Sequence, residues 1–187
     1  EVCYWPNLGY GSFGRRLTLD HSPWFDSADL YDPCRIRLAD IDGSGPVDLI
    51  YLGRKGAQLY FNRSGNSLSD PFVVDMPAAT ENLAAVQAAD LLGKGTACLV
   101  WNSHLPADAR HPVRYIDLMA DGKPHLLTRV YISLGHTTEI EYTPSTRFYL
   151  EDKQRGTPWI TRLAFPVHCV SKVTQRDQWR GSTFSSS

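Results

Sequence analysis

The sequence has almost no excess charge of either sign, which limits the partners that electrostatics could attract. Its 187 residues include 19 Lys and Arg and 20 Asp and Glu, for a formal net charge of −1. Basic runs and acidic tails are both absent. A neutral chain of this kind gives no electrostatic reason to expect nucleic acid or an anionic membrane as partner. We therefore expect no nucleic-acid binding and no direct insertion into a membrane.

Long apolar runs and targeting segments are also missing. No stretch of eighteen apolar residues could form a membrane-spanning helix. There is no initiator methionine and no signal peptide, and the chain opens inside an apolar strand pattern at residues 2–5. We expect it to be part of a longer protein. With 42% hydrophobic and 21% charged residues, its composition is that of an ordinary globular protein.

Cysteine is scarce and widely spaced. Cys3, Cys34, Cys98 and Cys169 form no CxxC pair, and a zinc site needs closer ligands. Four cysteines in a chain of this length do not make a disulfide scaffold either. Cys98 and Cys169 lie in apolar strand patterns, where a buried free thiol is the expected state. These features fit a compartment that keeps thiols reduced, such as the cytoplasm.

The first part of the chain is patterned as strands and turns. Residues 2–20 carry no helix signal and predict a strand pair around a turn-rich stretch. Residues 21–33 predict a connecting loop whose aromatic pair, Trp24 and Phe25, plugs against a sheet. Stacking of a ligand on these two rings is the alternative.

An acid-rich turn follows, with oxygen-bearing side chains at Asp40, Asp42, Ser44 and Asp48. These are positions 1, 3, 5 and 9 of a glycine-containing loop, which suits a hard cation such as calcium. Pro46 at position 7 still offers a backbone carbonyl, because proline lacks only the N–H donor. The alternative is an Asp/Gly turn between two strands with no metal, since these are ordinary turn residues.

The same stretch recurs from Asp40 to Asp90, which is 90 − 40 = 50 residues later. The glycines and the apolar strand that follows are repeated, at residues 93–101. The other ligand positions are not repeated: Asp42, Ser44 and Asp48 correspond to Leu92, Lys94 and Cys98. The second turn therefore keeps its shape without the cation chemistry, and we expect the Lys94 ammonium to neutralise Asp90. A long period with several short strands per unit is typical of propeller blades.

The strands of the first repeat are predicted to form one antiparallel, four-stranded sheet, at residues 35–39, 49–52, 57–61 and 72–76. The second repeat should begin at Val86, although residues 80–89 could be mistaken for a short helix. Its third and fourth strands are predicted at residues 113–118 and 125–132.

Residues 103–112 contain polar side chains that could be read as a catalytic cluster. His104, Asp108 and His111 lie in this proline-bounded loop, and Cys98 precedes it. No motif orders these residues. We therefore expect them to be solvated loop residues without a catalytic role.

The last third of the chain has a different pattern. Residues 137–142 alternate polar and apolar with a period of two, as in a strand with one exposed face. Further strands are predicted at residues 147–150, 159–163 and 167–173. The Ser-rich end, from about residue 181, is predicted to be disordered.

The motif Asp-x-Asp-Gly-x-Gly-x-x-Asp-Leu resembles the FG-GAP or VCBS type of propeller repeat. The stretches that carry a closer resemblance are residues 4–11, 37–62, 145–153 and 158–168. They resemble the B component of the tripartite insecticidal Tc toxins and the related virulence-plasmid B-type proteins. The resemblance implies an all-β fold, with propeller blades in residues 1–132 and the opening strands of an RHS-type shell in residues 133–187.

The resemblance also implies a function. Tc-toxin B components are non-catalytic; with a C component they enclose a toxic enzyme, and their propeller docks onto a translocating A component. Such proteins are made in the bacterial cytoplasm and released outside the cell. The alternative is a calcium-dependent, integrin-like adhesion or ligand-binding propeller, which would carry metal loops in every blade. Calcium is expected only at the first turn, and no segment resembles the ADP-ribosyltransferase domain of some relatives.

Overall fold

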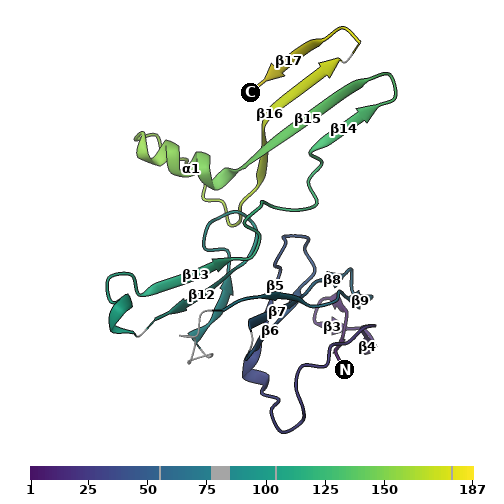
Figure 1. Cartoon of the computed structure of the whole chain (residues 1–187), viewed down its shortest axis with the longest axis vertical. Coiled ribbons are helices and arrows are strands. Elements are labelled where there is room, and N and C mark those ends of the chain that lie inside the picture. The colour runs from purple at the N-terminus through teal and green to yellow at the C-terminus, as the bar shows by residue number, and fades with distance from the viewer. Residues whose placement is uncertain (55, 77–84, 104, 178) are drawn as a thin grey trace. The chain divides into compact units, whose positions relative to one another are not determined.

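The computed structural model describes residues 1–54, 56–76, 85–103, 105–177 and 179–187, which divide into two compact units. One unit comprises Glu1–Ala89 and Ala97–Ala120, and the other comprises Asp90–Thr96 and Asp121–Ser187. All sheets in the described parts are antiparallel, and only one α-helix occurs there (Figure 1). The all-β prediction is confirmed. The assignment of residues 1–132 to propeller blades and of residues 133–187 to a shell stays a prediction.

The first repeat forms the four-stranded sheet predicted from its sequence. Its strands are β5 (Ile36–Ala39), β6 (Asp48–Gly53), β7 (Gly56–Tyr60) and β10 (Phe72–Val74), in the order β10-β7-β6-β5 (Figure 1). All neighbours in it are antiparallel. Alternation and turn residues were sufficient to locate it, because each strand pairs with a strand close to it in the chain.

The central strand β6 is buried on both faces, which explains its unbroken apolar sequence. Side chains alternate along a strand, so Ile50 and Leu52 point to one face while Leu49 and Tyr51 point to the other. The first face packs into one cluster with residues of the second repeat, namely Val86, Leu99 and Trp101. The second face packs with Leu19, Tyr60 and Leu68.

Within the described residues, the second repeat forms a sheet of three strands. They are β11 (Gln87–Ala89), β12 (Cys98–Asn102) and β13 (Val113–Asp117). The predicted fourth strand, at residues 125–132, is wrong for this sheet. The part of it that forms a strand, β14 (Arg129–Ile132), pairs instead with β15 (His136–Pro144). Gly135, with φ of 79°, closes a tight turn between them, so pairing with the next strand in the chain prevails.

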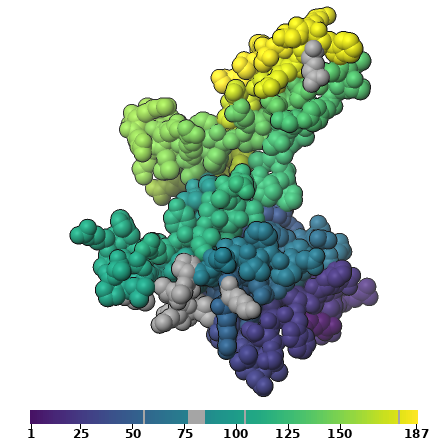
Figure 2. Space-filling view, viewed as in Figure 1, coloured from purple at the N-terminus to yellow at the C-terminus, as the bar shows by residue number. Residues whose placement is uncertain are grey.

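The N-terminal residues cover the second face of the first sheet. β1 (Cys3–Tyr4) pairs with β4 (Leu17–Thr18) as predicted, and between them β2 (Asn7–Gly9) and β3 (Ser12–Phe13) form a hairpin. A small hairpin of β8 (Asn62–Arg63) and β9 (Ser67–Leu68) lies between β7 and β10 of the first repeat. Figure 2 shows the N-terminal residues, in purple, lying against the blue residues of this part of the chain.

The aromatic plug was predicted correctly for only one of its two rings. Phe25 stacks on Tyr51 with ring centroids 4.6 Å apart, and it meets Tyr60 edge-on at 5.8 Å. Trp24 is 86% exposed and takes no part in the plug. The partly buried Phe25 ring packs against the sheet face, and its neighbour in the chain points to solvent.

The second unit contains a four-stranded sheet in the order β14-β15-β16-β17. β16 (His168–Asp177) corresponds to the strand predicted at residues 167–173. The predicted disorder of the tail is wrong, because residues 182–186 form β17 (Ser182–Ser186) on the edge of this sheet. The Asp177 carboxylate accepts the backbone N–H of Trp179 at 2.9 Å and supports the turn before β17. Backbone pairing with β16 therefore orders this Ser-rich segment, although its composition is typical of flexible tails.

The strand predicted at residues 147–150 is also wrong, because α1 (Ser145–Gln154) occupies this region. Two terminal signals could have indicated it: Pro144 precedes the first turn, and Gly156 follows with φ of 82°. Arg147 and Glu151 pair at 2.9 Å along its exposed side. The strand predicted at residues 159–163 is absent as well, because residues 157–167 are irregular.

The irregular segment folds back onto the helix. The Trp159 indole N–H donates to Asp152 at 2.7 Å, and its ring meets Tyr149 edge-on with centroids 5.8 Å apart. Two short 3-10 turns complete the described structure, η1 (Pro33–Arg35) and η3 (Pro106–Asp108). In the described parts of the chain no helix has the length and apolar character needed to cross a bilayer.

Candidate metal centre

The first turn brings three predicted ligands together. One oxygen from each of Asp40, Asp42 and Asp48 lies within 4.8 Å of the other two. Asp42 and Asp48 are buried, and Asp40 is half-buried. Ser44 belongs to the same turn and donates its backbone N–H to Asp42 at 2.9 Å. Whether the Ser44 hydroxyl also serves as a ligand stays a prediction.

Asp48 is the structural centre of the turn. Its two carboxylate oxygens accept the backbone N–H groups of Ile41 at 2.8 Å and of Asn62 at 2.7 Å, so it connects the turn to β8. Burial raises the pKa of Asp48, and the charges of Asp42 and Asp40 raise it further. The two backbone hydrogen bonds act in the opposite direction. Repulsion from the other two acids therefore contributes to the raised pKa of Asp48, but burial contributes more.

Only one of the two carboxylate oxygens of Asp40 accepts a hydrogen bond in the described structure. Its Oδ2 accepts the backbone N–H of Gly45 at 3.0 Å, whereas its Oδ1 is buried without a hydrogen-bond partner. Buried polar atoms are almost always paired, so this oxygen needs a donor or a cation. Oxygen ligands alone, with three carboxylates, are the donor set that calcium prefers. The residues present thus fit a hard cation.

The second turn repeats this geometry and keeps the acid at Asp90, but it lacks acids at the positions of Asp42 and Asp48. Gly95 donates its N–H to Asp90 Oδ2 at 2.7 Å, just as Gly45 does to Asp40. The other Asp90 oxygen accepts the backbone N–H of Lys94 at 2.9 Å, so both oxygens of Asp90 are paired. Cys98, fully buried, takes the place of Asp48. The prediction that the second copy keeps the turn is confirmed; neutralisation of Asp90 by the Lys94 ammonium stays a prediction.

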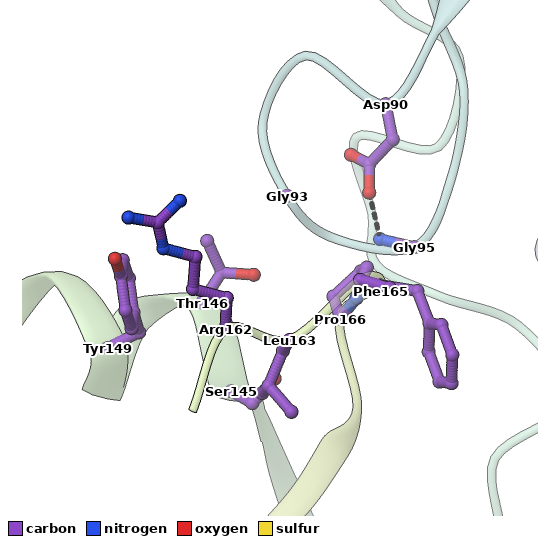
Figure 3. Close-up of a pocket in the computed structure, with 11 residues that line it drawn as sticks. Asp90, Gly93, Gly95, Ser145, Thr146, Tyr149, Arg162, Leu163, Phe165 and Pro166 are labelled. Atoms are coloured by element: carbon purple, nitrogen blue, oxygen red, sulfur yellow. Dashed lines mark hydrogen bonds between the residues drawn. The ribbon is translucent and has the colours of Figure 1, made fainter. Parts of the chain in front are cut away.

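A cavity of about 660 Å³ lies beside the second turn, within the second unit (Figure 3). Its wall combines Asp90 and Gly93 from the turn, Thr146 and Tyr149 from α1, and residues 162–166. In Figure 3 the Asp90 carboxylate points toward the Gly95 N–H, across from the α1 side chains. No sequence signal could have located this cavity, because its walls come from three distant stretches of chain.

Asp108, in the loop at residues 103–112, contacts Ser103 and Arg114. Its carboxylate accepts the Ser103 hydroxyl at 2.6 Å and pairs with Arg114, and both contacts lower its pKa. A general base would need the opposite shift. Cys98 is buried on its sheet, and His104 lies outside the described residues. Asp108 thus holds the loop in place.

Residues 62–187 match the family described as the insecticide toxin TcdB middle/N-terminal region. The chain belongs to this family. The predicted resemblance to Tc-toxin B components is thereby confirmed, whereas the propeller and the FG-GAP, VCBS and RHS repeat types stay predictions. A comparison with curated proteins finds no match.

Solved structures extend the similarity to almost the whole chain. In the crystal structure of TcdB2-TccC3, the matched chain is 29% identical over 98% of this one, with a TM-score of 0.83. A Tc holotoxin pore of Photorhabdus luminescens matches with 31% identity over 94% and a TM-score of 0.77. The chain spans only 9% and 8% of the length of those two chains. It therefore corresponds to a small part of these large assemblies.

Proposed function

We propose that this chain is a structural, non-catalytic segment of a Tc-toxin B-type component. The observation that carries the proposal is the similarity over 98% of the chain to a chain of the TcdB2-TccC3 structure. At 29% identity the likeness concerns the sequence as well as the fold. The hydrogen bonds of Asp108, which hold its loop together, support a structural role for the polar residues that most resembled a catalytic cluster.

We further propose that its partners are a toxin C component and a translocating A component. TcdB2 occurs together with TccC3 in the matched crystal structure, and a second match is a Tc holotoxin pore. By this analogy the chain helps to enclose the toxic enzyme and to dock the enclosed cargo onto the pore. Release from the bacterial cell would then precede its action.

The charge pattern of the second sheet supports a role as a wall around an unfolded cargo. Glu139 lies between Arg129, at 2.8 Å, and Arg176, at 3.2 Å. Glu141 pairs with Lys172 at 3.2 Å. These side chains share one face of the sheet, because their positions alternate along the strands. Charges neutralised within the face leave little net charge to retain a passing polypeptide.

The test is co-expression of the full-length protein that contains this chain with a C-type component carrying its toxic enzyme. We expect the two to co-purify and the enzyme to resist added protease until the complex is denatured. An A-type pore component should then bind the purified complex in a pull-down assay. Failure of the C-type component to co-purify, or an enzyme that protease degrades freely, would contradict the proposal.

We also propose that the first turn binds calcium and the second does not. Three clustered carboxylates and the unpaired Oδ1 of Asp40 support the first half. The substitutions at Leu92 and Lys94 support the second half, because they remove an oxygen and add a positive charge. Binding should be weak, since the twelfth loop position holds Tyr51 where tighter loops place a bidentate Glu. A single acid-rich turn does not favour the alternative of an adhesion propeller with calcium in every blade.

A further inference from the structure

The glycines of the second turn lie directly against another part of the second unit. A Cβ atom added at Gly93 would lie 2.6 Å from Cγ2 and 2.9 Å from Oγ1 of Thr146, at the start of α1. Added at Gly95, it would lie 3.4 Å from both Pro166 and His168. Carbon atoms without a covalent bond pack best at about 3.5–4.0 Å, so Gly93 leaves no room for a side chain.

The first-turn glycine that corresponds to Gly95 has no such neighbour. Gly45 corresponds to Gly95, and both have positive φ, of 105° and 71°. A Cβ atom added at Gly45 would meet nothing within 4 Å. Backbone conformation therefore favours glycine at both Gly45 and Gly95, but close neighbours restrict only Gly95 of this pair.

The surface that receives the second turn is held together by its own hydrogen bonds. Ser145 donates its N–H to the carbonyl of Val167 at 2.7 Å, and the Ser145 hydroxyl accepts the N–H of Val167 at 2.9 Å. Ser145 is buried. This double contact joins the start of α1 to residues 166–168, so that Thr146, Pro166 and His168 form one surface.

We propose that the second turn has exchanged a cation for a segment of its own chain. Residues 90–96 form an internal docking site, and the surface formed by Thr146, Pro166 and His168 is its ligand. The turn needs no ion, because both oxygens of Asp90 are paired with backbone N–H groups. The native packing of residues 121–187 then depends on this turn, whichever partners the whole protein has.

The experiment compares Gly93→Ala with Gly45→Ala in the full chain, each with calcium and with a chelator. The readout is the rate of cleavage by trypsin after Arg155, beside α1, relative to cleavage after Arg63 in the first unit. Proteolysis of a locally opened segment follows the population of the open form. We expect Gly93→Ala to speed cleavage after Arg155 by about tenfold or more with or without calcium. Gly45→Ala should leave that rate within about twofold.

A variant on the opposite side of the contact separates docking from backbone strain. Thr146→Leu enlarges the side chain against Gly93 without touching the turn, and it should also speed cleavage after Arg155. Combining Gly93→Ala with Thr146→Ala removes the two closest atoms and should restore part of the protection. Equal cleavage rates in Gly93→Ala and Gly45→Ala, or no restoration and no effect of Thr146→Leu, would overturn the proposal. If Gly93→Ala does not fold, Thr146→Leu with Thr146→Val as its control decides the question.

Discussion

Asp42→Ala and Asp90→Ala are the test and the control for the candidate metal centre, since each removes an acid from one of the two turns. Asp42→Ala removes one of three clustered carboxylates, whereas Asp90→Ala removes an acid from a turn that has no cluster in the described structure. We expect wild type and Asp90→Ala to bind calcium with a Kd on the order of 10⁻⁴–10⁻³ M. Asp42→Ala should show no binding in calorimetric titration. Equal uptake by all three proteins, or none by any, would leave the first turn as a purely structural element.

We expect Asp48 to make the proposed calcium binding depend on pH. Burial is the main reason that the pKa of Asp48 in the folded protein is raised above its ordinary value. The folded protein therefore holds the Asp48 proton more tightly than the unfolded chain does. Without calcium, the contribution of Asp48 to stability is present below the unfolded pKa and is lost as pH rises through the folded pKa. Calcium needs the ionised carboxylate, so its affinity should rise with pH by up to about tenfold per unit in that range.

Calorimetry in buffers of different ionisation enthalpy checks this pH dependence, because binding would release a proton from Asp48. An affinity that stays constant from about pH 4 to about pH 7 would contradict the role of Asp48 as a titrating ligand.

Tyr51 connects the N-terminal loop to the first sheet through a partly buried hydrogen bond. Its hydroxyl donates to Asp26, and burial together with Asp26 raises the pKa of Tyr51 to about 12. Tyr51→Phe keeps the ring that stacks on Phe25 but leaves Asp26 without this donor. We expect a loss of about 1–2 kcal/mol in the free energy of unfolding. The control is Tyr60→Phe, which loses only a bond to the neutral Gln58 and should cost less in the same denaturant titration.

At the scale of the elements, ion pairs between side chains link strand β15 to its neighbours β14 and β16. Glu139 pairs with arginines on both neighbouring strands, whereas the Glu141 carboxylate pairs with Lys172. Exposed ion pairs contribute little and are screened by salt. Glu139→Gln should therefore lower the thermal midpoint slightly and more than Glu141→Gln does. The difference should disappear in 1 M salt, and a difference that persists there would argue against ion pairing as its cause.

Helix α1 illustrates how local patterns can mislead at this scale. Its aromatic residues, Phe148 and Tyr149, favour a strand by propensity alone. Pro144 before the helix and Gly156 after it, together with the packing of Trp159 on Tyr149, favour the helix. The tertiary contact outweighs a weak intrinsic preference.

Unpaired sheet edges dominate the expected behaviour of the isolated chain at the scale of the whole molecule. β17 is an edge strand without charge or proline, which is an open template for another strand. We expect residues 1–187 alone to be poorly soluble or oligomeric by light scattering after size-exclusion chromatography. Phe184→Lys, on this edge, should shift the chain toward monomer.

Trp24→Lys is the matched control for this prediction, because Trp24 is also exposed but lies outside every strand. Equal effects of the two substitutions would point to general surface hydrophobicity. A wild-type chain that is a concentration-independent monomer would contradict the prediction itself.

The four strands of the first repeat, the acid-rich turn and its degenerate copy could all be predicted from sequence. Each depends on neighbours within a few residues, because alternation and turn glycines are local properties. Only the tertiary structure decided that Asp40 keeps an unpaired buried oxygen, that β14 pairs with β15 and that residues 182–186 are ordered. It also decided that Gly93 lies against Thr146. In these features burial and backbone pairing outweigh local preference, and the contact of Gly93 with Thr146 also joins parts of the chain that are distant in sequence.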